Sequence, residues 1–204
     1  MKITVFSAFL LIFLIFGCSK DSGSRFFDKS NSLSYKIIIS ENAGQNEKRA
    51  AEIFQTFISK AVGCILPIQS DTAVITDHEI RIGTSNRTSE KGLPLREDGF
   101  WIRTKGESLI FAGAGKGIIY GVVDFLEKYA GCNMLAPGVE VIAKTTKLRI
   151  PDIEYTGAPA NSFRVAQMNY EGNDLFSYWM RTNDIPEMFA DGYYVHTFNK
   201  LVPW

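Results

Sequence analysis

The chain has few of the residues from which metal sites are usually built. Its 204 residues include three cysteines and two histidines. His78 and His196 lie far apart in the sequence, and the cysteines lack the close spacing of a Cys/His zinc site. The sequence therefore predicts no metal site, and no motif in it predicts another cofactor.

An excess of charge of either sign is also lacking. The 22 Lys and Arg residues balance 22 Asp and Glu residues, so the formal net charge is zero. Nucleic-acid binding usually needs a basic excess, so we expect no nucleic-acid partner. With 46% hydrophobic residues the composition is that of a globular protein, and the length allows one full domain and part of another.

A long apolar run occurs at the N-terminus, over residues 3–16 after Lys2. It is shorter than the roughly 20 residues that span a bilayer, and it has the form of the apolar region of a signal peptide. The run ends in Gly17-Cys18, which resembles a bacterial lipoprotein signal in which the cysteine is acylated after cleavage. We expect residues 1–17 to be this signal and Cys18 to be the lipidation site. The alternatives are an ordinary secretion signal with an inert Cys18, and a retained membrane helix.

Residues 18–34 are polar and rich in serine, which predicts a flexible tether. Ser19-Lys20-Asp21 resembles the export signal of surface-displayed lipoproteins, although a solvated linker explains it equally well. We expect an exported protein held on a Gram-negative membrane by a lipid anchor without spanning it, in the periplasm or on the cell surface.

Residues 35–155 are expected to form an α+β domain. Strand patterns at 35–40, 79–83, 99–104, 108–112, 139–143 and 147–150 alternate with two amphipathic helices, one over residues 45–62 ended by Gly63 and one near 118–130 ended by Gly131. This order predicts a mixed β-sheet with both helices on one face. Gly121 interrupts the second helix, and close packing on the sheet would explain it. Cys64 and Cys132 end two similar helix-to-strand units and could be bridged or remain buried thiols.

The glycines near residue 115 match neither the P-loop nor the dinucleotide-binding spacing. They are part of a different pattern that continues through the second helix to a Pro-Gly turn, formed by Gly115, Lys116, Gly117, Tyr120, Gly121, Phe125, Leu126, Pro137 and Gly138. This pattern resembles the N-terminal domain found beside α-glucuronidases and β-hexosaminidases, in glycoside hydrolase families 67 and 20. The resemblance implies an accessory domain packed against a catalytic (β/α)8 barrel.

Residues 156–204 begin with a linker and then a new pattern. Ser162-Phe163-Arg164, the segment around Trp179 and residues 195–203 resemble the opening of the barrel-type domain that follows this N-terminal domain in related bacterial proteins. A complete (β/α)8 barrel needs roughly 250 residues, so the remaining residues suffice for the first one or two units. We therefore expect an incomplete barrel, in a truncated product or a fragment.

Three residues of this second part are candidates for substrate binding. Arg164 could bind a hydroxyl or carboxylate of a sugar, or form an internal ion pair. His196 and Asn199 could lie at a strand end in a sugar pocket, or His196 could be a structural histidine. The segment is also rich in aromatic residues, which suit sugar rings but more often form a core. Glycosidases use two carboxylates, and no acidic residue here matches a catalytic motif, so no catalytic residue is predicted; the acidic residues considered are Glu171, Asp174, Asp184, Glu187 and Asp191.

These features together predict an exported lipoprotein of glycan degradation, with a carbohydrate ligand. It would be the accessory domain of a glycoside-hydrolase-like protein acting on O-glycosidic bonds, and would not be catalytic by itself. The alternatives are a non-catalytic carbohydrate-binding or cell-surface interaction module, and a nonfunctional remnant. The sequence predicts no oligomeric state.

Overall fold

The computed structural model describes residues 25–28, 35–87, 95–164 and 174–182. Its centre is a six-stranded sheet with the strand order β10-β5-β6-β4-β2-β3. The strands are β2 (Lys36–Ile39), β3 (Ile68–Ser70), β4 (Glu79–Ile82), β5 (Phe100–Lys105), β6 (Ser108–Gly113) and β10 (Glu154–Gly157). Strands β3, β2, β4 and β6 are parallel to one another, whereas β5 is antiparallel to both β6 and β10. The expected mixed α+β sheet is confirmed.

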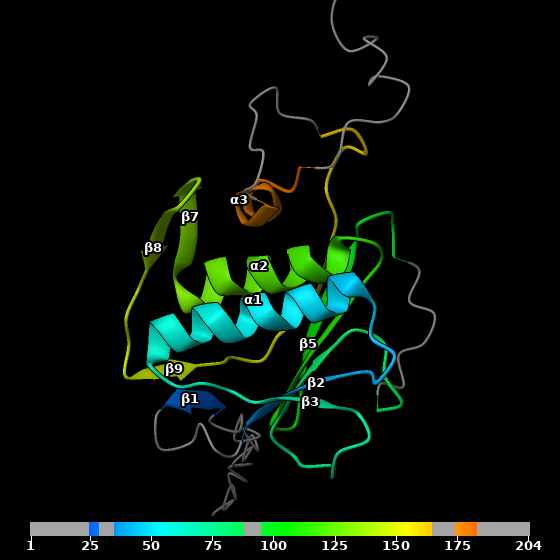
Figure 1. The fold of residues 1–204 in the computed structure, drawn as a ribbon, viewed down its shortest axis with the longest axis vertical. Helices are drawn as coiled ribbons and strands as arrows, with labels where there is room; N and C mark the ends of the chain where they lie inside the picture. Colours follow the sequence, from blue (N-terminus) through cyan, green and yellow to red (C-terminus); the bar gives the residue numbers. More distant parts are fainter. Residues whose placement is uncertain (1–24, 29–34, 88–94, 165–173, 183–204) are drawn as a thin grey trace, which may run out of the picture.

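Two long helices cover one face of this sheet, α1 (Gln45–Val62) and α2 (Gly117–Ala130), and they lie side by side (Figure 1). Each ends at a glycine in the left-handed conformation, Gly63 with φ 76° and Gly131 with φ 61°. A residue with a side chain rarely adopts such a φ, so these glycines end the helices where the sequence predicted.

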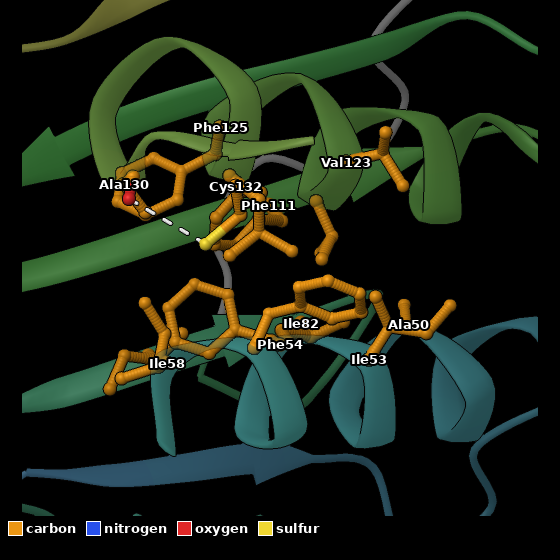
Figure 2. Packing of buried hydrophobic residues seen from close by; sticks show 14 of the residues in the cluster. Ala50, Ile53, Phe54, Ile58, Ile82, Phe111, Val123, Phe125, Ala130 and Cys132 are labelled. Carbon is orange, nitrogen blue, oxygen red and sulfur yellow. Dashed lines mark hydrogen bonds between the residues drawn. The ribbon is translucent and has the colours of Figure 1, made fainter. Parts of the chain in front are cut away.

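The core lies between the two helices and the sheet. Aromatic rings meet there in a chain, with Phe54 of α1 5.7 Å from both Phe111 of β6 and Phe125 of α2 between ring centroids (Figure 2). All three side chains are completely buried. Burial of apolar surface of this size is the main stabilising contribution to such a domain.

The other face of the sheet has no helix among the described residues; it buries Ile38, Trp101 and Ile110, and it also carries a group of charged side chains. Because side chains alternate along a strand, Glu79, Arg81 and Ser108 point away from the helices. Ser108 donates a hydrogen bond to the backbone carbonyl of Asp77. The carboxylate of Glu79 is fully buried and accepts hydrogen bonds from the side chains of Arg87 and Arg81 and from the backbone amide of Thr76. The segments 71–78 and 83–87, on either side of β4, are therefore held together by a buried ionic cluster that the sequence did not predict.

Two two-stranded antiparallel sheets complete the domain. Strand β1 (Phe26–Asp28) pairs with β9 (Lys147–Arg149), and β7 (Cys132–Ala136) pairs with β8 (Val139–Ile142). Residues 25–28 were expected to belong to the flexible tether, and this part of the expectation is wrong. Phe27 is completely buried, and Arg25 donates to the carbonyl of Gly106 and forms an ion pair with Asp152.

The segment after residue 152 is not a bare linker. Glu154–Gly157 adds β10 to the edge of the sheet, and α3 (Asp174–Trp179) packs on α2 and β7, on the side of the helix layer that faces away from the sheet (Figure 1). Trp179 of α3 lies 4.7 Å from the Phe57 ring of α1 and is buried. The expected first units of a (β/α)8 barrel are not confirmed by the described residues. Among those residues, no helix is both long and apolar enough to cross a bilayer.

Cys64 and Cys132 are both buried and free. Burial raises the pKa of both thiols, that of Cys132 to about 11. The sequence left open a disulfide between Cys64 and Cys132 or two buried free thiols, and the structure has the buried free thiols.

Candidate functional site: a polar cleft between α2 and β10

The motif glycines allow α2 to begin very close to the sheet. A Cβ on Gly117 would lie 2.1 Å from the carbonyl oxygen of Gly99, and a Cβ on Gly121 would lie 3.1 Å from Phe100 of β5. Gly115 has a φ of 56°, beside Asp98. The close approach of α2 to β5 thus explains the glycine pattern, and it agrees with the close packing expected from Gly121 in the sequence.

Asp98 organises the start of α2. This residue has a φ of 54°, unusual for a residue with a side chain, and its side chain is held from two directions. Its Oδ1 accepts the backbone amide of Lys116 at 2.9 Å, and its Oδ2 accepts Arg164 at 2.6 Å. A strained backbone held by two such hydrogen bonds is typical of a site that must keep one geometry.

Arg164 is fully engaged by the protein. Its Nε donates to the carbonyl of Arg181 at 2.6 Å, and one terminal nitrogen donates to the carbonyls of Asn161 and Ser162. Its other terminal nitrogen binds Asp98. Burial favours a lower pKa for this guanidinium, but hydrogen bonds with Tyr120 and Asp98 outweigh it and raise the pKa. Of the two roles open from the sequence, Arg164 has that of an internal ion pair.

Arg181, which follows α3, connects that segment to α2. It donates to Glu127 at 2.5 Å, lies 3.6 Å from Asp124 and also donates to the carbonyl of Trp179. Tyr120, which precedes Asp124 by one helical turn, donates its hydroxyl to the carbonyl of Thr182 at 3.0 Å. Residues spaced by three or four along a helix share a face, so α2 presents one polar stripe that holds the segments 161–164 and 174–182.

A cleft of about 480 Å³ lies beside this stripe, between α2, β10 and residues 158–161. Tyr155 of β10 donates its hydroxyl to Asp124, and the Lys128 ammonium lies 4.5 Å from the centre of the Tyr155 ring. Burial, followed by the hydrogen bond to Asp124 and the charge of that carboxylate, raises the pKa of Tyr155, so this phenol remains protonated at neutral pH.

The chemistry that this cleft can support is limited by how its carboxylate is used. Asp124 is the one acidic residue among the described residues that line it, and it already binds Tyr155, Lys128 at 2.8 Å and Arg181. Glycoside hydrolysis by the usual mechanism needs a second carboxylate across the scissile bond. Within the described part of the chain, no group of three or more His, Cys, Asp or Glu side chains could hold a metal ion.

The sequence-predicted site residues divide into two groups. Arg164 is in this network, whereas Cys18, His196 and Asn199 lie outside the described residues. The sequence analysis missed Asp98 and Arg181. The Asp98-Gly99 pair is a turn signal that could have drawn attention to Asp98, but nothing in the sequence indicates that Arg181 faces α2.

No family model and no curated protein matches the chain. Solved structures with partial similarity are glycoside hydrolases. A GH138 enzyme targeting pectin rhamnogalacturonan II is 19% identical, with 64% of this chain and 16% of that chain covered and a TM-score of 0.40. A GH115 4-O-methyl-α-glucuronidase with specificity for decorated arabinogalactans is 14% identical, with 68% and 19% covered and a TM-score of 0.45.

A GH20 β-N-acetylhexosaminidase from Streptomyces coelicolor A3(2) is likewise 14% identical, with 64% and 23% covered and a TM-score of 0.45. The chain thus spans between 16% and 23% of the length of these three proteins. The structure neighbours are glycoside hydrolases at low identity and partial coverage, a similarity that decides neither reaction nor sugar.

Proposed function

We propose that this chain is an exported lipoprotein of glycan degradation, anchored through Cys18, in which residues 35–155 form the accessory domain of a glycoside-hydrolase-like protein acting on O-glycosidic bonds. Residues 156–204 would begin the partner domain of the same protein. By itself the chain would bind glycan without hydrolysing it.

The polar stripe on α2 carries this proposal. Tyr120 belongs to the glycine-containing pattern that resembles the accessory domain, and its hydroxyl reaches the backbone of Thr182 rather than a group within the domain. Glu127 of the same stripe binds Arg181, and Asp98, in the turn before β5, binds Arg164. The polar side chains of this helix face form hydrogen bonds and ion pairs with the segment that follows the domain. An accessory domain needs such contacts to hold a neighbouring domain in a fixed orientation.

The alternative is a non-catalytic carbohydrate-binding or cell-surface module. The carboxylate of Asp124 is occupied by three partners in the α2–β10 cleft, which fits either proposal because neither makes this chain catalytic. The two proposals share the glycan and the anchor, and they differ in whether a hydrolase domain belongs to the same protein.

Anchoring is tested by growing cells with labelled palmitate and comparing the protein with its Cys18→Ser variant. Label on the wild type and none on the variant is expected. Equal absence of label from both proteins, with the N-terminus cleaved elsewhere, would contradict the lipid anchor.

The glycan role is tested by affinity electrophoresis of the purified protein in gels that contain neutral or acidic polysaccharides, together with assays on aryl glycosides. Retardation by at least one polysaccharide without hydrolysis is expected. Turnover of an aryl glycoside would overturn the non-catalytic assignment, and no retardation by any polysaccharide would overturn the glycan ligand.

A further inference from the structure

The β1–β9 sheet lies close in the chain to the proposed lipid anchor. Strand β1 begins at Phe26, and residues 18–24 are the whole connection between the start of the tether and Arg25, the first described residue. Seven residues reach at most about 25 Å even when fully extended. An anchor on Cys18 would therefore hold β1 within that distance of the bilayer.

Strand β1 is firmly attached to the rest of the domain. The ring of Phe27 is completely buried and lies 4.9 Å from that of Tyr35 and 6.1 Å from that of Phe54, between ring centroids. The amide of Ile150 donates to the carbonyl of Arg25 at 2.8 Å. The anchor would thus act on a packed part of the fold, and the side of the domain that carries β1 would be the side nearest the membrane.

The outer face of the β1–β9 sheet is basic. Side chains alternate along a strand, so Leu148 points inward and is buried, whereas Lys147 and Arg149 point outward and are exposed. The register places Lys147 opposite Asp28 and Arg149 opposite Phe26. The Lys147 ammonium lies 3.6 Å from the centre of the Phe26 ring. Two cations, one carboxylate and one aromatic ring therefore share this face.

A cleft of about 760 Å³ continues the basic surface beyond the sheet. Lys144, which is exposed, lines it together with Lys147 and Asp28. Lys60 also lines it but binds Glu140 at 2.6 Å, so that this pair adds no net charge. Among the described residues, three cations thus stand against one carboxylate. We call this surface the basic face; it consists of Phe26, Asp28, Lys144, Lys147 and Arg149.

The basic face and α3 lie on opposite sides of the helix layer. In Figure 1, β1 and β9 lie below α1, whereas α3, which packs on α2 and β7, lies above α2. The segment 174–182, which the polar stripe on α2 holds, is therefore on the far side of the domain from the basic face.

We propose that the basic face rests on an anionic membrane surface, with Lys144, Lys147 and Arg149 directed toward the lipid phosphates. This inference rests on the proposed anchoring through Cys18 and adds the face that meets the lipid. Lysine and arginine are attracted to anionic headgroups within a Debye length, about 10 Å at 0.1 M salt. Because a short tether keeps the lipid at a high effective concentration, a few cations suffice to orient the domain. The domain then separates the membrane from whatever the polar stripe on α2 holds.

The test couples the chain from Cys18 onward, which is the proposed mature protein, to a maleimide lipid through the Cys18 thiol. Cys64 and Cys132 are buried and burial raises the pKa of both thiols, so they react slowly. The vesicles contain phosphatidylcholine alone or mixed with phosphatidylglycerol. Since the maleimide lipid replaces the acyl chains, the basic face is tested whether or not cells lipidate Cys18. A failure of the anchor in the palmitate experiment and a failure of the basic face are therefore separate results.

The measurement is hydrogen exchange by the amides of residues 144–150. We expect it to be about fivefold slower on the anionic vesicles than on the neutral ones, and high salt should abolish the difference. The variant Lys144→Gln/Arg149→Gln, which keeps Lys147 on the Phe26 ring, should lose the slowing. Its unfolding temperature should equal that of the wild type, because both side chains are exposed.

The matched control is Lys48→Gln/Arg96→Gln, which also removes one lysine and one arginine from exposed positions. Lys48 lies near the start of α1, and Arg96 lies beside residues 159–162, so neither belongs to the basic face. The control should keep the slowing. An equal loss in the control would show nonspecific charge attraction and overturn the proposal.

Three further results would also overturn it. Equal slowing on neutral vesicles would remove the role of charge, and slowing confined to another part of the domain would assign the membrane contact to a different face. Slowing that follows the density of protein on the vesicle, and not its lipid composition, would show that the basic face contacts a second copy of the chain.

Discussion

The two faces of the central sheet are stabilised by different physical means. The face toward α1 and α2 is apolar, with Phe54, Phe111 and Phe125 in contact. The opposite face also buries Ile38 and Ile110, but it holds in addition the buried carboxylate of Glu79, which forms an ion pair with Arg87, whose side chain is 2% exposed. The first face needs only hydrophobic residues of suitable size, whereas the second needs, besides its apolar residues, particular charged partners at particular positions.

The comparison teaches where the fold tolerates change. An apolar contact is nondirectional and loses stability in proportion to the surface and volume removed. A buried ion pair contributes little compared with an apolar pair of the same shape, yet losing one partner leaves the other charge buried and uncompensated. The polar stripe on α2 is a third and weaker case, because its ion pairs are partly exposed.

The largest effect is expected in the core. Phe54→Ala should lower the free energy of unfolding by about 4 kcal/mol, because it removes a ring that contacts both a strand and the second helix. Urea unfolding followed by circular dichroism measures it. Phe54→Leu, which keeps most of the volume, should cost less than half as much, and equal losses would argue against the cavity explanation.

On the opposite face, Glu79→Gln should lower the free energy of unfolding by about 3 kcal/mol, since the Arg87 charge remains buried without its counter-ion. The control is Glu154→Gln, whose carboxylate is 63% exposed and lies 3.5 Å from Arg103, and which should change stability by less than about 0.5 kcal/mol. If the two variants were equally stable, the segments on either side of β4 would not depend on the ionic cluster.

A smaller and local effect is expected where the segment 174–182 packs on α2. Arg164→Gln should release the segment 174–182, because it removes the hydrogen bond to the carbonyl of Arg181 and the ion pair with Asp98. Hydrogen exchange in α3 should rise about tenfold while the unfolding temperature of the domain changes little. The variant Arg103→Gln, at an exposed ion pair on β5, serves as control and should leave α3 unchanged.

The smallest effect concerns the pH dependence of stability that is due to Asp71, which lies in the segment before β4. Hydrogen bonds from the amides of Asn86 and Glu41 lower the pKa of Asp71 in the folded protein, against a smaller opposing effect of burial. Because the folded pKa lies below the unfolded value of about 3.9, this contribution is present above pH 4 and is lost as the pH falls through the folded pKa. Unfolding in urea between pH 2.5 and pH 5, roughly the range of these titrations, should show a shallower dependence for Asp71→Asn. An unchanged slope would assign the dependence to other carboxyl groups.

Much of the domain could be predicted from local sequence. The helix expected over residues 45–62 is α1 with the same bounds, since its apolar stripe and Gly63 are local signals that tertiary contacts did not override. Gly121 correctly indicated close packing of α2. By contrast, Phe26–Asp28 resembled a tether, because three residues contain too little periodicity to reveal that β9 would pair with them.

By itself, the amino-acid sequence determined the helices, their glycine ends, most strands and the mixed α+β class, because these depend on periodicity and on backbone conformations within a few residues. Only the tertiary structure decided that Arg164 binds Asp98, 66 residues away, and that Arg87 is buried against Glu79. Only the tertiary structure brought Lys60, Lys144 and Lys147 to one cleft. The physical reason is that a charge takes its partner from whichever segment the packed core brings near, and no local pattern records that choice.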